Sequence, residues 1–239
     1  MISANRQIDS KKTAIYAFSK SPLLGSSKSR LRAGVDSITA NMISRALFEI
    51  TKSALASARS QSVDVFWAVE ERDKNSEIWG SIPIVLQGPG ELGDRISFVE
   101  SQASLGYSQW IFIGSDLPAM NCHLLKEAVQ QLEQCDFVLG PASDGGFYLF
   151  GAKENLHPSF WNSIPYSSSE TLLTLKQKLV GNISYLPILT DLDVKAQFNQ
   201  IKNELQNMVL QPNEPQRILL SILQSDNYSN PEAIERSTT

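Results

Sequence analysis

Short apolar runs alternate along most of the chain with segments that have helical spacing. The apolar runs have the length of buried strands and cover 14–18, 63–69, 84–86, 110–114, 137–139, 147–150 and 183–189. Helical spacing covers 37–60, 93–105, 121–133, 168–180 and 195–209, and a last apolar turn covers 218–223. Because strands that alternate with helices form mostly parallel sheets, we expect a three-layer α/β/α fold with a mostly parallel central sheet.

The longest helical segment should pack one face on this sheet. Its predicted buried positions recur every three or four residues and are Ile38, Met42, Ile43, Ala46, Leu47, Ile50 and Ala54. A chain of 239 residues suits one large domain better than two small ones. We therefore expect a single domain over 13–224, between disordered polar tails over 1–12 and 225–239.

Composition narrows the classes of partner. The formal net charge of −4 disfavours a nucleic-acid partner but permits a small anionic ligand held by local basic loops. No window has the length of a membrane span and the N-terminus has no apolar signal core, so we expect a cytoplasmic protein. Cys122 and Cys135 have no CxxC spacing and are expected to be reduced, and the two histidines lack a metal-ligand spacing.

The most distinctive segments follow the predicted strands. Glycine-rich or charged residues occupy 20–30, 87–95, 115–118 and 141–146. Ligands of open parallel sheets bind outside the carboxyl ends of the strands, near the point where the strand order reverses. We therefore expect these four segments to meet at one site.

The first of these loops carries three cations, Lys20, Lys28 and Arg30, together with small hydroxyl residues and Gly25. Backbone N–H groups of such a loop can approach phosphate oxygens while the cations neutralise their charge. The P-loop and GxGxxG patterns are both absent. A solvated basic loop is an equally good interpretation of the composition.

Asp116, in Gly114-Ser115-Asp116-Leu117-Pro118, follows a very apolar strand. An acid there is expected to be poorly solvated unless it binds something, and a divalent cation such as Mg²⁺ or Mn²⁺ is a natural partner. The alternative is that Asp116 caps the helix that starts near Asn121. We favour the interpretation of Asp116 as a metal ligand.

Three further groups are more ambiguous. The turn at Asp144-Gly145-Gly146 can face an acceptor, with Asp144 as a base, or can be ordinary hairpin chemistry. The loop over 87–95 can touch a base or ribose, or orient Arg95 toward phosphate. Asp193 can be a second metal ligand, although capping of a helix near Lys195 is the favoured interpretation.

Taken in order, these segments resemble a known family. The matching motifs are Lys20-x-Pro22-x-x-Gly25-x-x-Lys28-Ser29-Arg30-Leu31, Gln87-Gly88-x-Gly90-x-Leu92-Gly93-x-Arg95, Gly114-Ser115-Asp116-x-Pro118, Leu139-Gly140-Pro141-Ala142-x-Asp144-Gly145-Gly146-x-Tyr148-Leu149 and Asp191-x-Asp193. They resemble GT-A-like nucleotide-diphospho-sugar transferases of the radical-SAM/selenodomain-associated type. The first loop is also similar to that of 2-phospho-lactate guanylyltransferase, a small nucleotidyltransferase. The sequence departs from the family pattern at Ser29, at Glu91 and over 166–168, where Tyr-Ser-Ser replaces Trp-Ser-Thr.

The resemblance implies a GT-A-like fold and a set of roles. The nucleotide and its phosphates would be bound by Lys20, Pro22, Gly25, Lys28, Ser29, Arg30, Gln87, Gly88, Gly90 and Arg95. Asp116 and Asp193 would hold Mg²⁺ or Mn²⁺. The acceptor would contact Asp144, Gly145, Gly146 and Tyr148, and the catalytic residues would be Asp116, Lys28 and Asp144.

Two reactions fit this arrangement. The first is metal-dependent glycosyl transfer from a nucleotide-sugar donor to a small-molecule acceptor. The alternative is nucleotidyl transfer, in which a phosphorylated acceptor attacks a nucleoside triphosphate and pyrophosphate leaves. A non-catalytic nucleotide-binding protein is a further alternative, because fold alone does not establish activity. An NAD-dependent oxidoreductase is disfavoured, because the glycine-rich fingerprint is missing.

Overall fold

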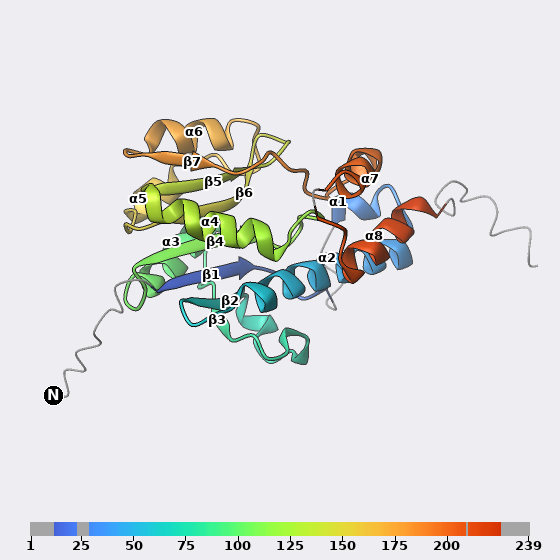
Figure 1. Ribbon diagram of the computed structural model, residues 1–239, viewed down its shortest axis with the longest axis horizontal. Helices are drawn as coiled ribbons and strands as arrows, with labels where there is room; N and C mark the ends of the chain where they lie inside the picture. The colour runs from blue at the N-terminus through green and yellow to red at the C-terminus, as the bar shows by residue number, and fades with distance from the viewer. Residues whose placement is uncertain (1–11, 23–28, 209, 226–239) are drawn as a thin grey trace, which may run out of the picture.

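A seven-stranded sheet forms the centre of the computed structural model, which describes residues 12–22, 29–208 and 210–225 (Figure 1). Its strands are β1 (Thr13–Phe18), β2 (Val63–Val69), β3 (Ile84–Leu86), β4 (Gln109–Gly114), β5 (Phe137–Pro141), β6 (Phe147–Ala152) and β7 (Ile183–Tyr185). Their order is β3-β2-β1-β4-β6-β5-β7. Among these described strands only β6 runs antiparallel to its neighbours. The predicted mostly parallel sheet is confirmed.

Eight helices connect or follow the described strands. They are α1 (Ser29–Arg32), α2 (Ser37–Ala58), α3 (Leu92–Ala103), α4 (Cys122–Gln134), α5 (Pro158–Asn162), α6 (Thr171–Lys178), α7 (Phe198–Gln206) and α8 (Glu214–Gln224). Three 3-10 turns, η2 (Glu71–Asp73), η3 (Glu77–Trp79) and η4 (Lys195–Gln197), lie between them. Each predicted helix is present, and the short α1 and α5 were not predicted.

One strand and one helix have ends that differ from the sequence prediction, each for an identifiable reason. The predicted strand over 183–189 stops at Tyr185, because Pro187 has no N–H to donate and the ladder with β5 is interrupted there. The predicted apolar turn over 218–223 is the end of a longer helix. Asn213 starts α8 by accepting a hydrogen bond from Gln216 N (3.0 Å), with a proline in the first turn.

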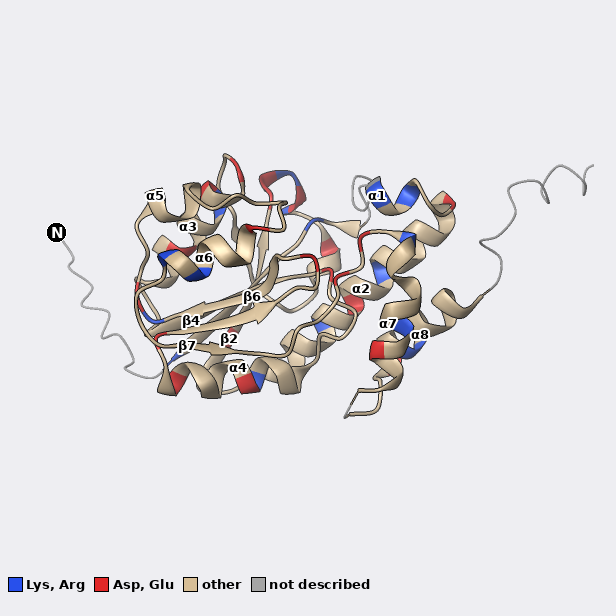
Figure 2. Ribbon diagram, turned by 90° about the horizontal axis from the view of Figure 1, so that it is seen from above, with Lys and Arg blue, Asp and Glu red and all other residues tan. Residues whose placement is uncertain are grey.

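The sheet separates two hydrophobic cores. One core lies beneath α2, α4, α7 and α8, and the other lies beneath α3, α5 and α6. Figure 2 shows α3, α5 and α6 on one side of the strands and α4 on the other. The three-layer arrangement is therefore confirmed.

The buried face of α2 is displaced from the predicted one and is wider, since it also includes Thr39, Ala40, Ser44, Phe48, Thr51, Leu55 and Ala58. Ile43, Leu47 and Ile50 are buried as expected. Ile38 and Met42 are 74% and 48% exposed, so their predicted burial is wrong. These two residues lie on the helix face that continues through the exposed Arg45 and Glu49, and that face is turned toward solvent.

The arrangement of β1 and β4 places the candidate site. β1 pairs with β2 on one side and with β4 on the other, so the strand order reverses here. Phe18 and Gly114 are register partners, and the two strands therefore end at the same level. Figure 1 shows α1, α7 and α8 beyond these carboxyl ends. The described helices include none that is long and apolar enough to cross a membrane.

Candidate functional site

A small pocket of about 20 Å³ lies where β1 and β4 end. It is lined by Ser19, Lys20, Pro22, Ser44, Phe48, Ser115 and Asp116. Lys20 and Pro22 come from the loop after β1, and Asp116 comes from the loop after β4. The structure thus brings together residues from two segments that the sequence assigned to one site.

Asp116 is exposed, so the expectation that it is poorly solvated is wrong. The apolar strand β4 ends at Gly114, which is itself exposed, and the next two residues lie at the open edge of the sheet. The capping alternative is also excluded, because α4 begins at Cys122 and Asn121 accepts the hydrogen bond from Leu124 N (3.0 Å). The role of Asp116 as a metal ligand stays a prediction.

The segment around Leu192 is hydrogen-bonded to the loop that follows β4. Its backbone N–H donates to the carbonyl oxygen of Asp116 (3.0 Å), so Asp191 and Asp193 flank the residue that meets Asp116. The N-cap position of the next helical turn is Val194, one residue after Asp193. The side-chain oxygen of Gln197 accepts from the N–H groups of both Asp193 and Val194 (2.8 Å each). The role of the Asp193 side chain, as a cap or as a metal ligand, stays a prediction.

These acidic residues have the chemistry of a divalent cation site. Figure 2 shows acidic segments at the carboxyl end of the sheet, on the side that faces α1 and α7. No cluster of three or more potential ligands occurs in the described part of the chain. Mg²⁺ commonly takes only one or two protein carboxylates and fills its shell with phosphate oxygens and water. Asp116 and Asp193 fit that requirement.

The first loop is described only in part. Gly25 and Lys28 lie outside the described residues, as does the side chain of Ser29. Arg30 is exposed on α1. The backbone N–H of Ser21 donates to the buried carboxylate of Asp73 (3.1 Å), which anchors the start of the loop to η2. The predicted phosphate contacts of this loop stay predictions.

Glu70, which the sequence analysis did not single out, sits at the end of β2 among three cations. Its carboxylate meets Arg95 Nη1 at 2.7 Å, Arg72 Nε at 2.8 Å and Lys20 Nζ at 3.7 Å. Partial burial raises the pKa of Glu70, but the Arg95 hydrogen bond and the charges of Lys20 and Arg72 outweigh it and hold the pKa below its ordinary value. The Glu70 carboxylate thus gathers three cations at this edge of the site.

Arg95 and Gln87 hold the second glycine-rich loop in shape. Arg95 donates through Nε to the carbonyl oxygen of Gly90 (2.8 Å) and through Nη1 to Gln87 Oε1 (3.2 Å). Gln87 in turn donates to the carbonyl oxygen of Ala68 (2.7 Å). Gly88 and Gly90 have φ angles of 74° and 97°, which glycine adopts without strain. These four predicted nucleotide-binding residues are engaged with one another and with β2, and their contacts with a nucleotide stay predictions.

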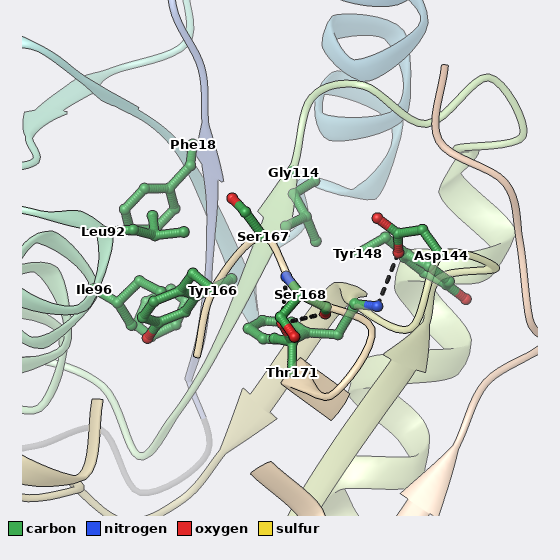
Figure 3. A pocket seen from close by; sticks show the side chains of 14 residues that line it. Phe18, Leu92, Ile96, Gly114, Asp144, Tyr148, Tyr166, Ser167, Ser168 and Thr171 are labelled. Carbon is green, nitrogen blue, oxygen red and sulfur yellow. Dashed lines mark hydrogen bonds between the residues drawn. The ribbon is translucent and has the colours of Figure 1, made fainter. Parts of the chain in front are cut away.

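A second and larger pocket, of about 210 Å³, opens on the α3, α5 and α6 side of the sheet (Figure 3). Its walls come from β1, β4, β6, the start of α3 and the segment 166–171. Three of the four predicted acceptor residues, Asp144, Gly146 and Tyr148, line this pocket. Gly114 lines it as well, whereas Ser115 and Asp116 line the small pocket. The two pockets are therefore lined by consecutive residues at the end of β4, the small one on the α2 side of the sheet and the larger one on the α3 side.

The turn between β5 and β6 is the predicted hairpin turn. Gly146 N donates to Asp144 Oδ1 (2.8 Å), which fixes the carboxylate at the pocket. Gly145 has a φ angle of 90°, and a Cβ atom there would overlap the carbonyl group of Ser169. Gly145 thus permits a close approach to Ser169 of the same chain. The Tyr148 hydroxyl donates to the carbonyl oxygen of Pro187 (2.9 Å), which fixes the position of the Tyr148 side chain.

Tyr166 and Glu100 are two further groups that the sequence did not assign to the site. Tyr166 lines the larger pocket, and its buried hydroxyl has no hydrogen-bond partner. Glu100, on α3, is fully buried and accepts hydrogen bonds from Trp161 Nε1 (2.8 Å), Leu156 N (3.1 Å) and Trp110 Nε1 (3.3 Å). In the sequence, the departure from the family pattern over 166–168 was the only sign of the pocket wall to which Tyr166 belongs.

Comparison with known proteins gives a class of fold. Residues 51–168 match a family described as "Uncharacterized protein conserved in bacteria (DUF2064)". No curated protein matches the sequence. Among solved structures, a protein from Desulfovibrio desulfuricans G20 named "putative nucleotide-diphospho-sugar transferase" has a TM-score of 0.77 and 24% identity, over 88% of this chain and 96% of the other.

Two nucleotidyltransferase structures share the fold more distantly. A 4-diphosphocytidyl-2C-methyl-D-erythritol synthase from Anaerococcus prevotii DSM 20548 has a TM-score of 0.53 and 10% identity, over 91% of this chain and all of the other. A CMP:2-keto-3-deoxy-manno-octonic acid synthetase complexed with CTP has a TM-score of 0.50 and 13% identity, over 82% of this chain and all of the other. The protein therefore has the nucleotide-diphospho-sugar transferase fold that the sequence resemblance implied.

Proposed function

We propose that the protein is a metal-dependent transferase that moves a glycosyl group from a nucleotide-diphospho-sugar donor to a small acceptor. The observation that carries the proposal is the pair of pockets at the end of β4, one lined by Gly114 and the other by Ser115 and Asp116. Asp116 and Lys20 line the small pocket, and Asp144 lines the larger one. This pairing separates residues suited to a diphosphate from a residue suited to an acceptor hydroxyl.

The donor diphosphate would lie at the mouth of the small pocket, because the pocket itself, of about 20 Å³, has room for roughly one water molecule. Lys20 is more than half exposed and makes the longest of the three ion pairs with Glu70, so it can turn toward a phosphate. Asp116 and Asp193 would hold Mg²⁺ or Mn²⁺, which supplies neutralisation of the charge on the departing diphosphate when bound. Arg72 and Arg95, which pair with the same Glu70 carboxylate as Lys20, are further cations with which a phosphate can pair.

Asp144 is the proposed base. Its Oδ1 is held by Gly146 N, which leaves Oδ2 to accept a proton. In the reaction, the acceptor hydroxyl oxygen forms a bond to the anomeric carbon of the sugar. The bond from that carbon to the diphosphate oxygen breaks, and its electron pair leaves with the nucleoside diphosphate. The hydroxyl proton passes to the carboxylate of Asp144.

The Asp116→Ala variant tests the donor site. We expect it to weaken Mn²⁺-dependent binding of nucleoside diphosphates at least tenfold, about 1.4 kcal/mol. The measurement is a calorimetric titration of UDP, ADP, CDP and GDP, each with and without Mn²⁺. Glu154→Ala, which removes an exposed carboxylate far along the chain from this segment, is the control. Unchanged Mn²⁺ and nucleotide binding by Asp116→Ala would show that the site is placed wrongly.

Nucleotidyl transfer is the second candidate, because two nucleotidyltransferases share the fold. The products separate the two reactions. Glycosyl transfer releases a nucleoside diphosphate from a nucleotide-sugar, and nucleotidyl transfer releases pyrophosphate from a nucleoside triphosphate. Product analysis with both donor classes distinguishes them. Nucleotide binding without either product would favour a non-catalytic binding protein.

A further inference from the structure

The walls of the larger pocket are mainly rings and aliphatic side chains. Phe18, Leu92, Ile96, Phe112, Phe147 and Tyr166 supply most of them. Figure 3 shows Phe18, Leu92, Ile96 and Tyr166 on one side of the space and Asp144 with Tyr148 on the other. A ligand that fills this space exchanges water for apolar contacts, and such burial stabilises rings and aliphatic groups.

Among the described residues that line the larger pocket, the charged side chain is acidic. Asp144 is a lining carboxylate, and no lysine, arginine or histidine is among the described residues that line the space. Burial raises the pKa of the Tyr166 hydroxyl, and the nearby Asp94 and Glu100 raise it further. A phosphate or carboxylate group placed here would be desolvated without a cationic partner.

Apart from the unpartnered Tyr166 hydroxyl, the hydroxyl groups of the deep wall are engaged with the chain. Thr171 Oγ1 lies within hydrogen-bond distance of the carbonyl oxygens of Pro165 (2.6 Å) and Ser168 (2.7 Å), which share its one donated proton. Ser168 Oγ accepts from Glu170 N (3.1 Å), and the Tyr148 hydroxyl is held by Pro187. A polyhydroxylated ligand would therefore lose hydrogen bonds to water that the deep wall does not replace.

We propose that this pocket binds the acceptor, and that the acceptor is an uncharged molecule with an apolar ring whose hydroxyl group faces Asp144. The assignment of the ring to the acceptor rests on the proposed function. The size is appropriate, because an apolar cavity of about 150 Å³ is known to hold benzene, and this pocket measures about 210 Å³. The attacking oxygen would lie toward Gly114, the residue that precedes Ser115 and Asp116 of the small pocket.

Three probes of similar size test the specificity: benzyl alcohol, benzyl phosphate and myo-inositol. The first two differ only by the phosphate, and the third keeps a ring but is covered with hydroxyl groups. Dissociation constants are measured by ligand-observed NMR titration of the full chain. We expect benzyl alcohol to bind at least tenfold more tightly than either of the others. Equal or tighter binding of benzyl phosphate or myo-inositol would overturn the proposal.

The Leu92→Lys variant places a cation in the wall at a half-exposed position, where the fold tolerates the change. We expect it to reverse the order of benzyl alcohol and benzyl phosphate. Leu105→Lys is the matched control, because Leu105 is 68% exposed and lies outside the pocket. The same reversal in the control, or no change in Leu92→Lys, would contradict the assignment of the probe site.

A competition experiment distinguishes failure of this inference from failure of the proposed function. UDP, ADP, CDP and GDP are added with Mn²⁺ to the complex with benzyl alcohol. We expect the diphosphate that binds to leave benzyl alcohol in place. Competitive displacement would show that the pocket holds the nucleobase and would overturn the acceptor assignment alone. If benzyl alcohol binds and no nucleotide does, the proposed function fails, and the acceptor assignment fails with it.

Discussion

Glu100 is a carboxylate buried in the second core without a cationic partner. Its three hydrogen-bond donors are two tryptophan side chains and one backbone N–H. Burial raises the pKa of Glu100 from 4.5 to about 7, although these three donors act in the opposite direction. The folded state therefore holds a proton at this position that the unfolded chain releases at lower pH.

The sign of the pH dependence follows. The contribution of Glu100 to stability is fully present below the pKa of the unfolded chain and is lost as pH rises from about 4.5 to about 7. The full loss is roughly 3 kcal/mol, at about 1.4 kcal/mol for each pKa unit.

We expect Glu100→Gln to flatten this dependence of the free energy of unfolding, measured with urea at pH 5 and pH 8. Glu133→Gln, which changes an exposed acid, should keep the slope of the parent protein. An unchanged slope in Glu100→Gln would refute this origin.

Single residues also set the limits of the sequence prediction. Asp116, Lys20 and Asp144 could be picked out because a strand end followed by charged or glycine-rich residues is a local pattern. Glu70 and Tyr166 could not, since their roles depend on neighbours far along the chain. Arg95, for example, meets Glu70 across 25 positions of sequence.

At the scale of elements, the β5–β6 turn is the most constrained part of the site. Gly145 lies in the left-handed region and packs against Ser169, while its carbonyl oxygen accepts from Leu172 N (2.9 Å). The turn and the start of α6 therefore hold each other, and together they set the position of Asp144.

We expect Gly145→Ala to destabilise the protein by about 2 kcal/mol or more, because it adds both backbone strain and an overlap with Ser169. Gly106→Ala is the matched control, since a Cβ atom at Gly106 meets nothing within 4 Å. Urea unfolding of the two variants measures the difference. Equal free energies of unfolding would mean that this contact does not constrain the turn.

The sequence predicted the elements better than their ends or their contacts. Strand and helix periodicities located β1 to β6 and the five main helices, because those patterns are local. The early end of β7 depends on Pro187, a visible residue whose effect was not applied. The walls of the larger pocket come from four separate elements and the segment 166–171, and which side chains meet there is decided only by tertiary packing.

At the scale of the whole molecule, both cores share one sheet. Neighbouring residues of β1 alternate between them, with Ile15 in the core under α2 and Tyr16 in the core under α3. Trp67 and Trp79 lie in the first core, and Trp110 and Trp161 lie in the second. Neither layer of helices can separate without exposing a face of the same strands.

We therefore expect the described part of the chain to unfold as one cooperative unit. Tryptophan fluorescence reports on side-chain packing in both cores, and far-ultraviolet circular dichroism reports on the helices. The two probes should give the same urea midpoint and the same slope. Two separated transitions would contradict the expectation of a single domain, which rests on the sequence.

The hydrogen bond from Leu192 to Asp116 also has a consequence for biosynthesis. A ribosome makes β4 and its acidic loop long before it makes the segment that completes them. The first strands and their helices can collapse while the polypeptide is still growing. The candidate site at Asp116 therefore stays incomplete in the nascent chain until the segment after β7 has left the ribosome. The proposed donor site is thus completed late in synthesis.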